Sequence, residues 1–345
     1  MRISELFGTE LPIIQAPMAG AQAGAMAIAV SNAGALGSLP CALLTTDSMR
    51  TELEAIRAQT SKPFNVNFFC HTPPVPSAER EAAWQTALAP FYREYGIDPA
   101  SIPSGQGRAP FSEDFADALE PYRPPVVSFH FGLPSKRLLG RVKGWGSKVL
   151  CTATTVDEAR WLESQGVNGI IAQGVEAGGH RGMFLTGDLT TQVGTFSLVP
   201  QVLRAVKLPV IAAGGIADAR GVATLLEMGA AGVQVGTAYL LCPEALTSAV
   251  QRAALKSEAS RHTALTNVFT GRPSRGIVNR VMRELGIMNG AAPEFPLAAA
   301  AIAPLRAKAE AAGLGDFTPL WSGQNATGCR EVPAAQLTLE LAAEV

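Results

Sequence analysis

The sequence has little charge of either sign and few aromatic residues, and it contains no long apolar run. Charged residues make up 17% of the 345 residues and the formal net charge is −1, so nothing marks a surface for nucleic acid or anionic membranes. No segment approaches the roughly 18 consecutive apolar residues of a membrane span, and the first residues lack the apolar core of a signal peptide. An apolar content of 47% is ordinary for a globular enzyme and argues against disorder. We therefore expect a soluble, cytoplasmic protein that binds neither nucleic acid nor membranes.

The sequence also lacks the spacings of several common sites. Its five cysteines are odd in number, scattered and without C-x-x-C spacing, which fits a reduced protein with no disulfide framework or zinc site. The four histidines show neither H-x-x-x-H nor H-x-H spacing, so no metal site is predicted. A G-x-G-x-x-G element after a strand and a G-x-S-x-G elbow are both missing, which excludes a Rossmann dinucleotide site and a serine hydrolase of that type.

Short apolar segments that alternate with helical patterns dominate the first two thirds of the chain. Eight strand candidates lie near residues 12, 35, 64, 125, 148, 169, 208 and 232. Repeated βα units predict a parallel sheet, and eight of them predict an α/β protein with a (β/α)8 TIM barrel, with a doubly wound open sheet as the alternative.

The segments that interrupt this alternation of strands and helices suggest how the chain divides into domains. We predict a TIM-barrel domain over residues 1–239, with residues 70–122 as an insertion over the barrel mouth. Residues 240–317 are expected to form a smaller, mainly helical domain that acts as a lid and a possible homodimer contact. Residues 318–345 are expected to return to the barrel.

A histidine lies among glycines directly after one of the predicted strands. The predicted strand from Gly169 ends at Gln173, and His180 follows within the run Glu176-Ala-Gly-Gly-His-Arg-Gly182. Barrels present their chemistry at the C-terminal ends of their strands, and glycines allow close approach of a ligand. His180 is therefore the catalytic candidate; the alternative is a loop histidine with ordinary hydrogen bonds. We expect its pKa near working pH, which permits it to act as a base or to bind an anion.

Two further strand ends carry glycine turns, at Gly214-Gly215 and at Gly236-Thr237. Because they follow the seventh and eighth predicted strands, they match the usual phosphate site of barrels. A phosphate site, the amides of Asn67 and Gln173, and little charge together suit FMN.

Six elements of the chain together resemble the FMN-dependent nitronate monooxygenases, formerly called 2-nitropropane dioxygenases. They are Gln15-Ala-Pro-Met-Ala-Gly20, Asn65-Val-Asn-Phe-Phe69, Glu176 to Gly182, Ala212-Ala-Gly-Gly-Ile216, Gln234-Val-Gly-Thr-Ala-Tyr239 and Thr270-Gly-Arg-Pro. The resemblance implies a TIM barrel with a smaller helical domain. It also implies oxidation of alkyl nitronates by O2 to carbonyl compounds and nitrite, without NAD(P)H.

The resemblance also suggests site residues. His180 falls on the catalytic histidine, and we assign His130 and Phe295 to the substrate pocket. We assign the flavin contacts to the strand ends and to one C-terminal turn: Ala16, Pro17, Met18, Ala19, Gly20, Asn67, Gln173, Gly178, Gly179, Ala213, Gly214, Gly215, Gln234, Gly236, Thr237, Gly323 and Gln324.

One segment departs from the family pattern. Residues 293–303 carry Phe295 and alanines where tyrosines and a lysine of the substrate pocket are expected. The sequence therefore predicts an apolar pocket that binds a carboxylated nitronate poorly. Two other functions remain open: an NAD(P)H-dependent FMN reductase of the enoyl-thioester or quinone type, and a flavin-binding protein without turnover.

Overall fold

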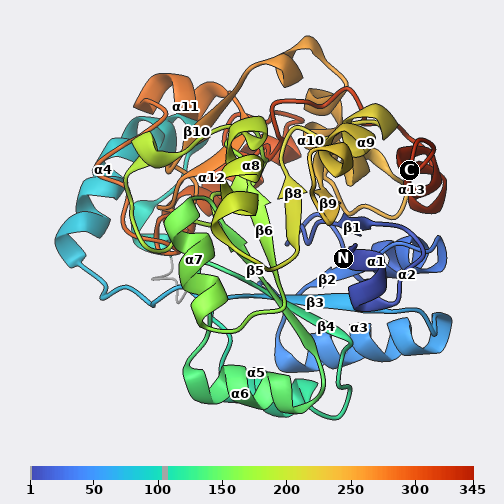
Figure 1. The fold of residues 1–345 in the computed structure, drawn as a ribbon. Coiled ribbons are helices and arrows are strands. Elements are labelled where there is room, and N and C mark those ends of the chain that lie inside the picture. The colour runs from blue at the N-terminus through green and yellow to red at the C-terminus, as the bar shows by residue number, and fades with distance from the viewer. Residues whose placement is uncertain (1, 103–107) are drawn as a thin grey trace.

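Eight parallel strands form the centre of the molecule and close into a barrel (Figure 1). The computed structural model describes residues 2–102 and 108–345. β1 pairs with β9 along one side, and on the other side the amide of Leu36 donates to the carbonyl of Ile13 at 2.9 Å, which closes the ring. The predicted (β/α)8 barrel is confirmed. Its strands, in their order around the sheet, are β1 (Ile13–Gln15), β9 (Gly232–Val235), β8 (Val210–Ala213), β6 (Gly169–Gln173), β5 (Lys148–Ala153), β4 (Val126–His130), β3 (Phe64–Phe69) and β2 (Gly37–Pro40).

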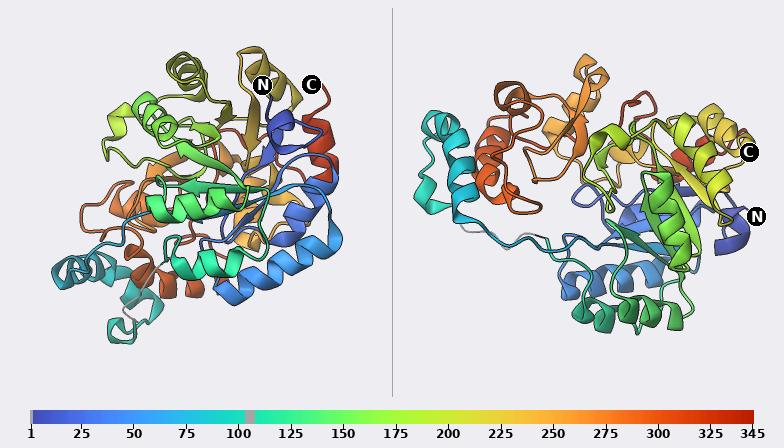
Figure 2. Two further views of the ribbon diagram at one scale, coloured as in Figure 1. Left: turned by 60° about the horizontal axis from the view of Figure 1, so that its bottom comes forward. Right: turned by 60° about the vertical axis from the view of Figure 1, so that its left-hand side comes forward.

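Helices cover the outside of the barrel and bury its strands on both faces, which explains why these strands read as short apolar runs. Thr45 caps the helix Thr46–Gln59, its hydroxyl accepting from the amide of Ser48 at 3.2 Å. The last helix packs on the second and the ninth (Figure 2). The outer helices are α1 (Ile3–Phe7), α2 (Gly24–Asn32), α3 (Thr46–Gln59), α5 (Glu113–Leu119), α6 (Lys136–Gly144), α7 (Val156–Ser164), α8 (Thr195–Ala205), α9 (Ala219–Glu227) and α13 (Ala334–Leu341).

A second hydrophobic core lies beside the barrel, built from residues 84–92 and 268–317. The region around it differs from the predicted helical domain in containing an antiparallel hairpin, β10 with β11. The elements of this region are α4 (Ala78–Tyr95), α10 (Ala249–Leu255), β10 (Thr263–Thr266), β11 (Ser274–Ile277), α11 (Arg280–Leu285) and α12 (Ala298–Ala311). Four short 3-10 helices, η1 (Pro99–Ser101), η2 (Leu189–Thr191), η3 (Thr237–Leu241) and η4 (Glu258–Arg261), lie in the connections.

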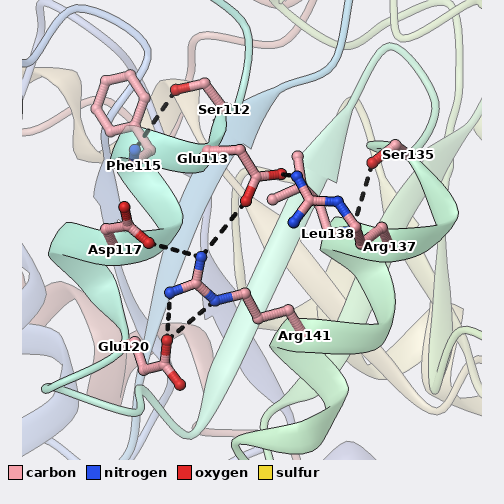
Figure 3. Close-up of polar contacts among 9 residues, drawn as sticks. All are labelled: Ser112, Glu113, Phe115, Asp117, Glu120, Ser135, Arg137, Leu138 and Arg141. Carbon is pink, nitrogen blue, oxygen red and sulfur yellow. Dashed lines mark hydrogen bonds and ion pairs between the residues drawn. The ribbon is translucent and has the colours of Figure 1, made fainter.

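Residues 70–122 are divided between the two cores. α4 packs on α12 (Figure 2). Between the two helices, the indole of Trp84 donates to the carbonyl of Ala298 at 3.1 Å and the hydroxyl of Tyr92 donates to the carbonyl of Ala301 at 2.7 Å. α5 instead stands in the helical layer of the barrel beside α6, where Arg141 pairs with Asp117 at 2.7 Å and also with Glu113 and Glu120 (Figure 3). Residues 103–107 of this segment lie outside the described residues.

A two-residue strand, β7 (Gly179–His180), connects the barrel to the second core. It pairs antiparallel with β11, with His180 opposite Ser274, and the next amide, that of Arg181, donates to the carbonyl of Pro273 at 2.9 Å. The backbone of His180 is thus held from both sides. Among the described residues, no helix is long and apolar enough to cross a membrane.

Candidate active site

A cavity of about 250 Å³ opens at the carboxyl ends of the barrel strands. Nearly all of the site residues assigned from the sequence line it, His130 and His180 among them. Two do not: Phe295 packs behind the cavity wall against Phe69 and Phe131, and the backbone amide of Gln324 donates to the carbonyl of Glu176 at 2.9 Å. The cavity wall also contains residues that the sequence did not single out: Phe69, Arg108, Thr152, Gln251, Arg306 and Trp321.

The two predicted glycine turns lie together at one end of this cavity. Gly214 and Gly215 follow β8 with φ angles of +120° and +73°, a backbone region that favours glycine. Within the described parts of the chain, the amides of Gly215, Gly236 and Thr237 donate no hydrogen bond to a protein group. Free amide donors at such turns suit a phosphate group.

Close backbone approach defines the neighbouring wall. A Cβ added to Gly178 would lie 2.5 Å from the amide nitrogen of Gly323, a distance at which atoms collide. The hydroxyl of Thr237 accepts from that same amide at 2.9 Å, so the C-terminal turn is tied to the end of β9. The side-chain oxygen of Gln234 is buried and has no partner among the described residues, which leaves it for a ligand.

The two amide side chains expected to face the flavin differ in which of their atoms remain free to bind a ligand. Gln173 accepts from the amide of Gly182 at 2.8 Å and donates to the carbonyl of His180 at 3.1 Å, so both ends of its side chain hold the His180 turn. Asn67 donates to the hydroxyl of Ser128 at 2.9 Å, which engages its nitrogen and leaves its oxygen as the group available to a ligand. The His180 turn is thus held by a donor and an acceptor on the same side chain, which explains why β6 ends in an amide residue, Gln173.

The ring of His180 lies among aromatic side chains, with centroids 5.2 Å from Phe295, 5.6 Å from Trp321 and 5.8 Å from Phe131. Its Nε2 is 2.9 Å from the hydroxyl of Thr270. Burial, and then the positive charge of Arg108, hold the pKa of His180 well below its ordinary value. The expectation of a pKa near working pH is therefore wrong, and the imidazole is neutral at neutral pH.

His130 supports the same turn. Its Nδ1 is 3.0 Å from the hydroxyl of Thr152, and its Nε2 is 3.2 Å from the carbonyl oxygen of His180. Burial lowers the pKa of His130 to about 3, so this ring is also neutral. A neutral imidazole has one N–H, and donating it to the carbonyl of His180 leaves the other nitrogen to accept from Thr152.

Arg181, the residue after the catalytic candidate, does not face the cavity. It is fully buried, and its guanidinium donates to the carbonyls of Gly174 and Gln173, each at 2.7 Å, and to the side chain of Gln192. The planar group closes the turn between β6 and β7 with several bonds at once.

The wall of the cavity carries two cations that the prediction of an apolar pocket did not include. Arg108 and Arg306 both line it, and within the described residues no aspartate or glutamate does. The prediction considered residues 293–303 alone, whereas Arg108 comes from the connection before β4 and Arg306 from a later turn of α12. Both cations thus come from segments that the prediction did not consider.

Comparisons with known proteins agree with this geometry. A sequence model of the nitronate monooxygenase family matches residues 1–344. The nitronate monooxygenase of Pseudomonas aeruginosa is 41% identical to the chain over 347 residues, covering 100% of this chain and 99% of that protein. The crystal structure of a nitroalkane oxidase from Streptomyces ansochromogenes superposes with a TM-score of 0.88 at 38% identity, covering 99% of this chain and 97% of that one. FabK from Thermotoga maritima superposes with a TM-score of 0.73 at 28% identity, covering 99% of this chain and 94% of that one. The resemblance seen in the motifs is confirmed, and the chain belongs to the nitronate monooxygenase family of flavin-dependent oxidoreductases.

Proposed function

We propose that this protein binds FMN and oxidises an alkyl nitronate or its parent nitroalkane with O2, giving a carbonyl compound and nitrite. The proposal rests mainly on one observation. A single cavity has free amides at its glycine turns and a neutral, hydrogen-bonded His180 in its wall. Membership of the family and the likeness to a nitroalkane oxidase support the same reaction class.

The residues present fit FMN. The amides of Gly215, Gly236 and Thr237 would receive its phosphate, and the free oxygens of Asn67 and Gln234 would accept from its ring edge. Beside Gly179, a lining residue of the cavity, an added Cβ would meet no protein atom within 4 Å, which leaves room for the ring to approach the backbone. When bound, FMN supplies the electron acceptor that the protein side chains lack.

His180 acts, on this proposal, as a general base. A neutral imidazole can take the α-proton of a nitroalkane, whereas an imidazolium would be needed to hold a nitronate by charge. Thr270 fixes the ring and its tautomer through Nε2, which leaves Nδ1 for the proton. The buried surroundings exclude water and keep the base unprotonated at neutral pH.

A comparison of two substrates shows whether His180 acts as a base or as an anion-binding group. In His180→Asn, kcat/KM for a neutral nitroalkane is expected to fall by about 10²- to 10⁴-fold, because the proton acceptor is lost. A preformed nitronate of the same chain has already lost that proton, so its kcat/KM should fall far less. Thr270→Val, which removes only the hydroxyl, is the matched variant and should show a smaller loss with the same preference. Equal losses on both substrates in His180→Asn would contradict the base role.

Anaerobic mixing tests the reaction class itself. Loss of the oxidised flavin bands with a nitronate, and no change with NADH, is the expected result for the purified protein loaded with FMN. Bleaching by NADH alone would identify a reductase of the enoyl-thioester or quinone type. Flavin that binds but responds to neither would identify a barrel without turnover, and failure to bind FMN would refute the cofactor assignment.

A further inference from the structure

Phe131, the residue directly after β4, is buried and has a φ angle of +68°. A bulky side chain in this left-handed region is an outlier, and such strain persists only where the surrounding structure enforces it. The ring of Phe131 lies 4.5 Å from that of His130, and 5.8 Å from that of His180 at an interplanar angle of 89°. The strained residue therefore packs on both histidine rings of the cavity.

The guanidinium of Arg272 covers this phenyl ring. Its central carbon lies 3.9 Å from the ring centroid of Phe131, and its nitrogen donates to the carbonyl of Met183, three residues after His180. Burial, opposed in part by the charge of Glu158, lowers the pKa of Arg272 to about 10, so the group is a cation at neutral pH. A desolvated cation is held on an aromatic face more strongly than an exposed one. Arg272 thus ties Phe131 to the loop that follows His180.

Arg272 belongs to a short segment that meets His180 at several points. The hydroxyl of Thr270 lies 2.9 Å from Nε2 of His180. Ser274 pairs with His180 in the register of β11 and β7, and its hydroxyl donates to the carbonyl of Arg272 at 3.0 Å. The segment therefore holds the ring of His180, its backbone and, through Arg272, the ring of Phe131 that packs against it.

Arg272 and Phe131 stand behind the cavity wall. His130 and His180 are among the described residues that line the cavity, whereas Arg272 and Phe131 are not. Any effect of Arg272 on a reaction in the cavity therefore passes through the groups that it holds.

We propose that Arg272 is a positioning residue for the reaction: stacked on Phe131 and bonded to Met183, it fixes the ring of His180 in the orientation that leaves Nδ1 free for the proton. This rests on the proposed role of His180 as the base. Arginine suits the task because its planar group can stack on a ring and donate in its plane at the same time.

The charge of Arg272 acts in the same direction as its contacts. After burial, the charges of Arg108, His130, Arg272 and His71, in that order, lower the pKa of His180. A cation near a histidine disfavours the protonated ring. Arg272→Met therefore raises the pKa of His180, whereas Arg272→Lys keeps the charge and loses the planar contact.

The kinetic test uses a neutral nitroalkane and its preformed nitronate with the protein loaded with FMN. Arg272→Met should lower kcat/KM for the nitroalkane by about 10-fold or more, because small misplacements of a reacting group are costly, and for the nitronate by much less. Combined with His180→Asn, it should cause no further loss, because Arg272 acts through that ring. Arg272→Lys should show the same pattern with a smaller loss, and it carries the test if Arg272→Met does not fold. Arg160→Met, at an exposed arginine of α7 that pairs with Asp157, is the control and should change neither rate.

Losses that multiply in the double variant, or that fall equally on both substrates, would refute the positioning role.

A spectroscopic measurement without turnover separates this proposal from the proposed function. Ring 15N spectra of the histidines, with His180→Asn to assign the signal, give the tautomer and the pKa of His180. In the wild-type protein the signal should be that of the neutral tautomer protonated at Nε2, between about pH 8 and 5.5. Arg272→Met should mix the two neutral tautomers or bring protonation into that range, and Arg272→Lys should mix the tautomers alone.

A signal of His180 in both variants that matches the wild type would overturn the proposal. If neither substrate is turned over and the signal still changes in Arg272→Met, the reaction class is wrong and the hold of Arg272 on His180 stands.

Discussion

Replacing Arg181 with methionine removes the buried cation that holds the His180 turn closed. The guanidinium makes two charge-assisted bonds of 2.7 Å, to the carbonyls of Gln173 and Gly174, and two longer ones to Gln192. Methionine matches much of the volume but leaves these buried acceptors without donors. Removing one partner from a buried, charged network costs about 3–5 kcal/mol of unfolding free energy. Lysine can replace one bond but not the fork, so Arg181→Lys should lose about 2 kcal/mol.

Urea unfolding followed by tryptophan fluorescence measures these differences. Arg204→Met is the matched control because Arg204 is exposed on α8, and it should stay within about 0.5 kcal/mol of wild type. A loss below about 1 kcal/mol in Arg181→Met would refute the role given to this network. Arg181→Met should also lower kcat. Arg181 donates to the carbonyl of Gln173, and the side chain of Gln173 in turn donates to the carbonyl of His180.

Two further predictions concern the cofactor wall and pH. Gly178→Ala should lower the FMN content after dialysis, because its Cβ would lie 2.5 Å from the amide nitrogen of Gly323 and displace that turn; normal FMN content would contradict the close approach. Burial lowers the pKa values of His71, His130 and His180 in the folded protein, so the unfolded chain takes up protons first as pH falls. The free energy of unfolding should therefore be highest above pH about 6.5 and decline below it. Between pH 6.5 and 5.5 each histidine should contribute a loss of no more than about 1 kcal/mol. A free energy of unfolding in urea that does not change over this range would contradict the prediction.

The barrel could be predicted because its strands have a local signature. β6 and β8 are short apolar runs buried on both faces, and each ends at a polar or glycine residue where the chain turns. The glycine turn after β8 could be predicted for the same reason, since Gly214 and Gly215 need a backbone conformation that few other residues adopt.

The hairpin of β10 and β11 could not be predicted, because its strands are four residues each and mix small, polar and charged residues. Its pairing partner, β7, is two residues long and lies some 90 positions earlier in the chain. Such a sheet is set by tertiary contacts rather than by local pattern.

The two cations in the cavity wall could not be predicted, for a different reason. The alanines in residues 293–303 do replace polar groups, but a cavity wall is assembled from distant segments. Arg108 lies in a connection without periodicity, and nothing local indicates that its side chain meets Arg306 across the cavity. A net charge of −1 for the whole chain likewise says nothing of a positive wall inside it.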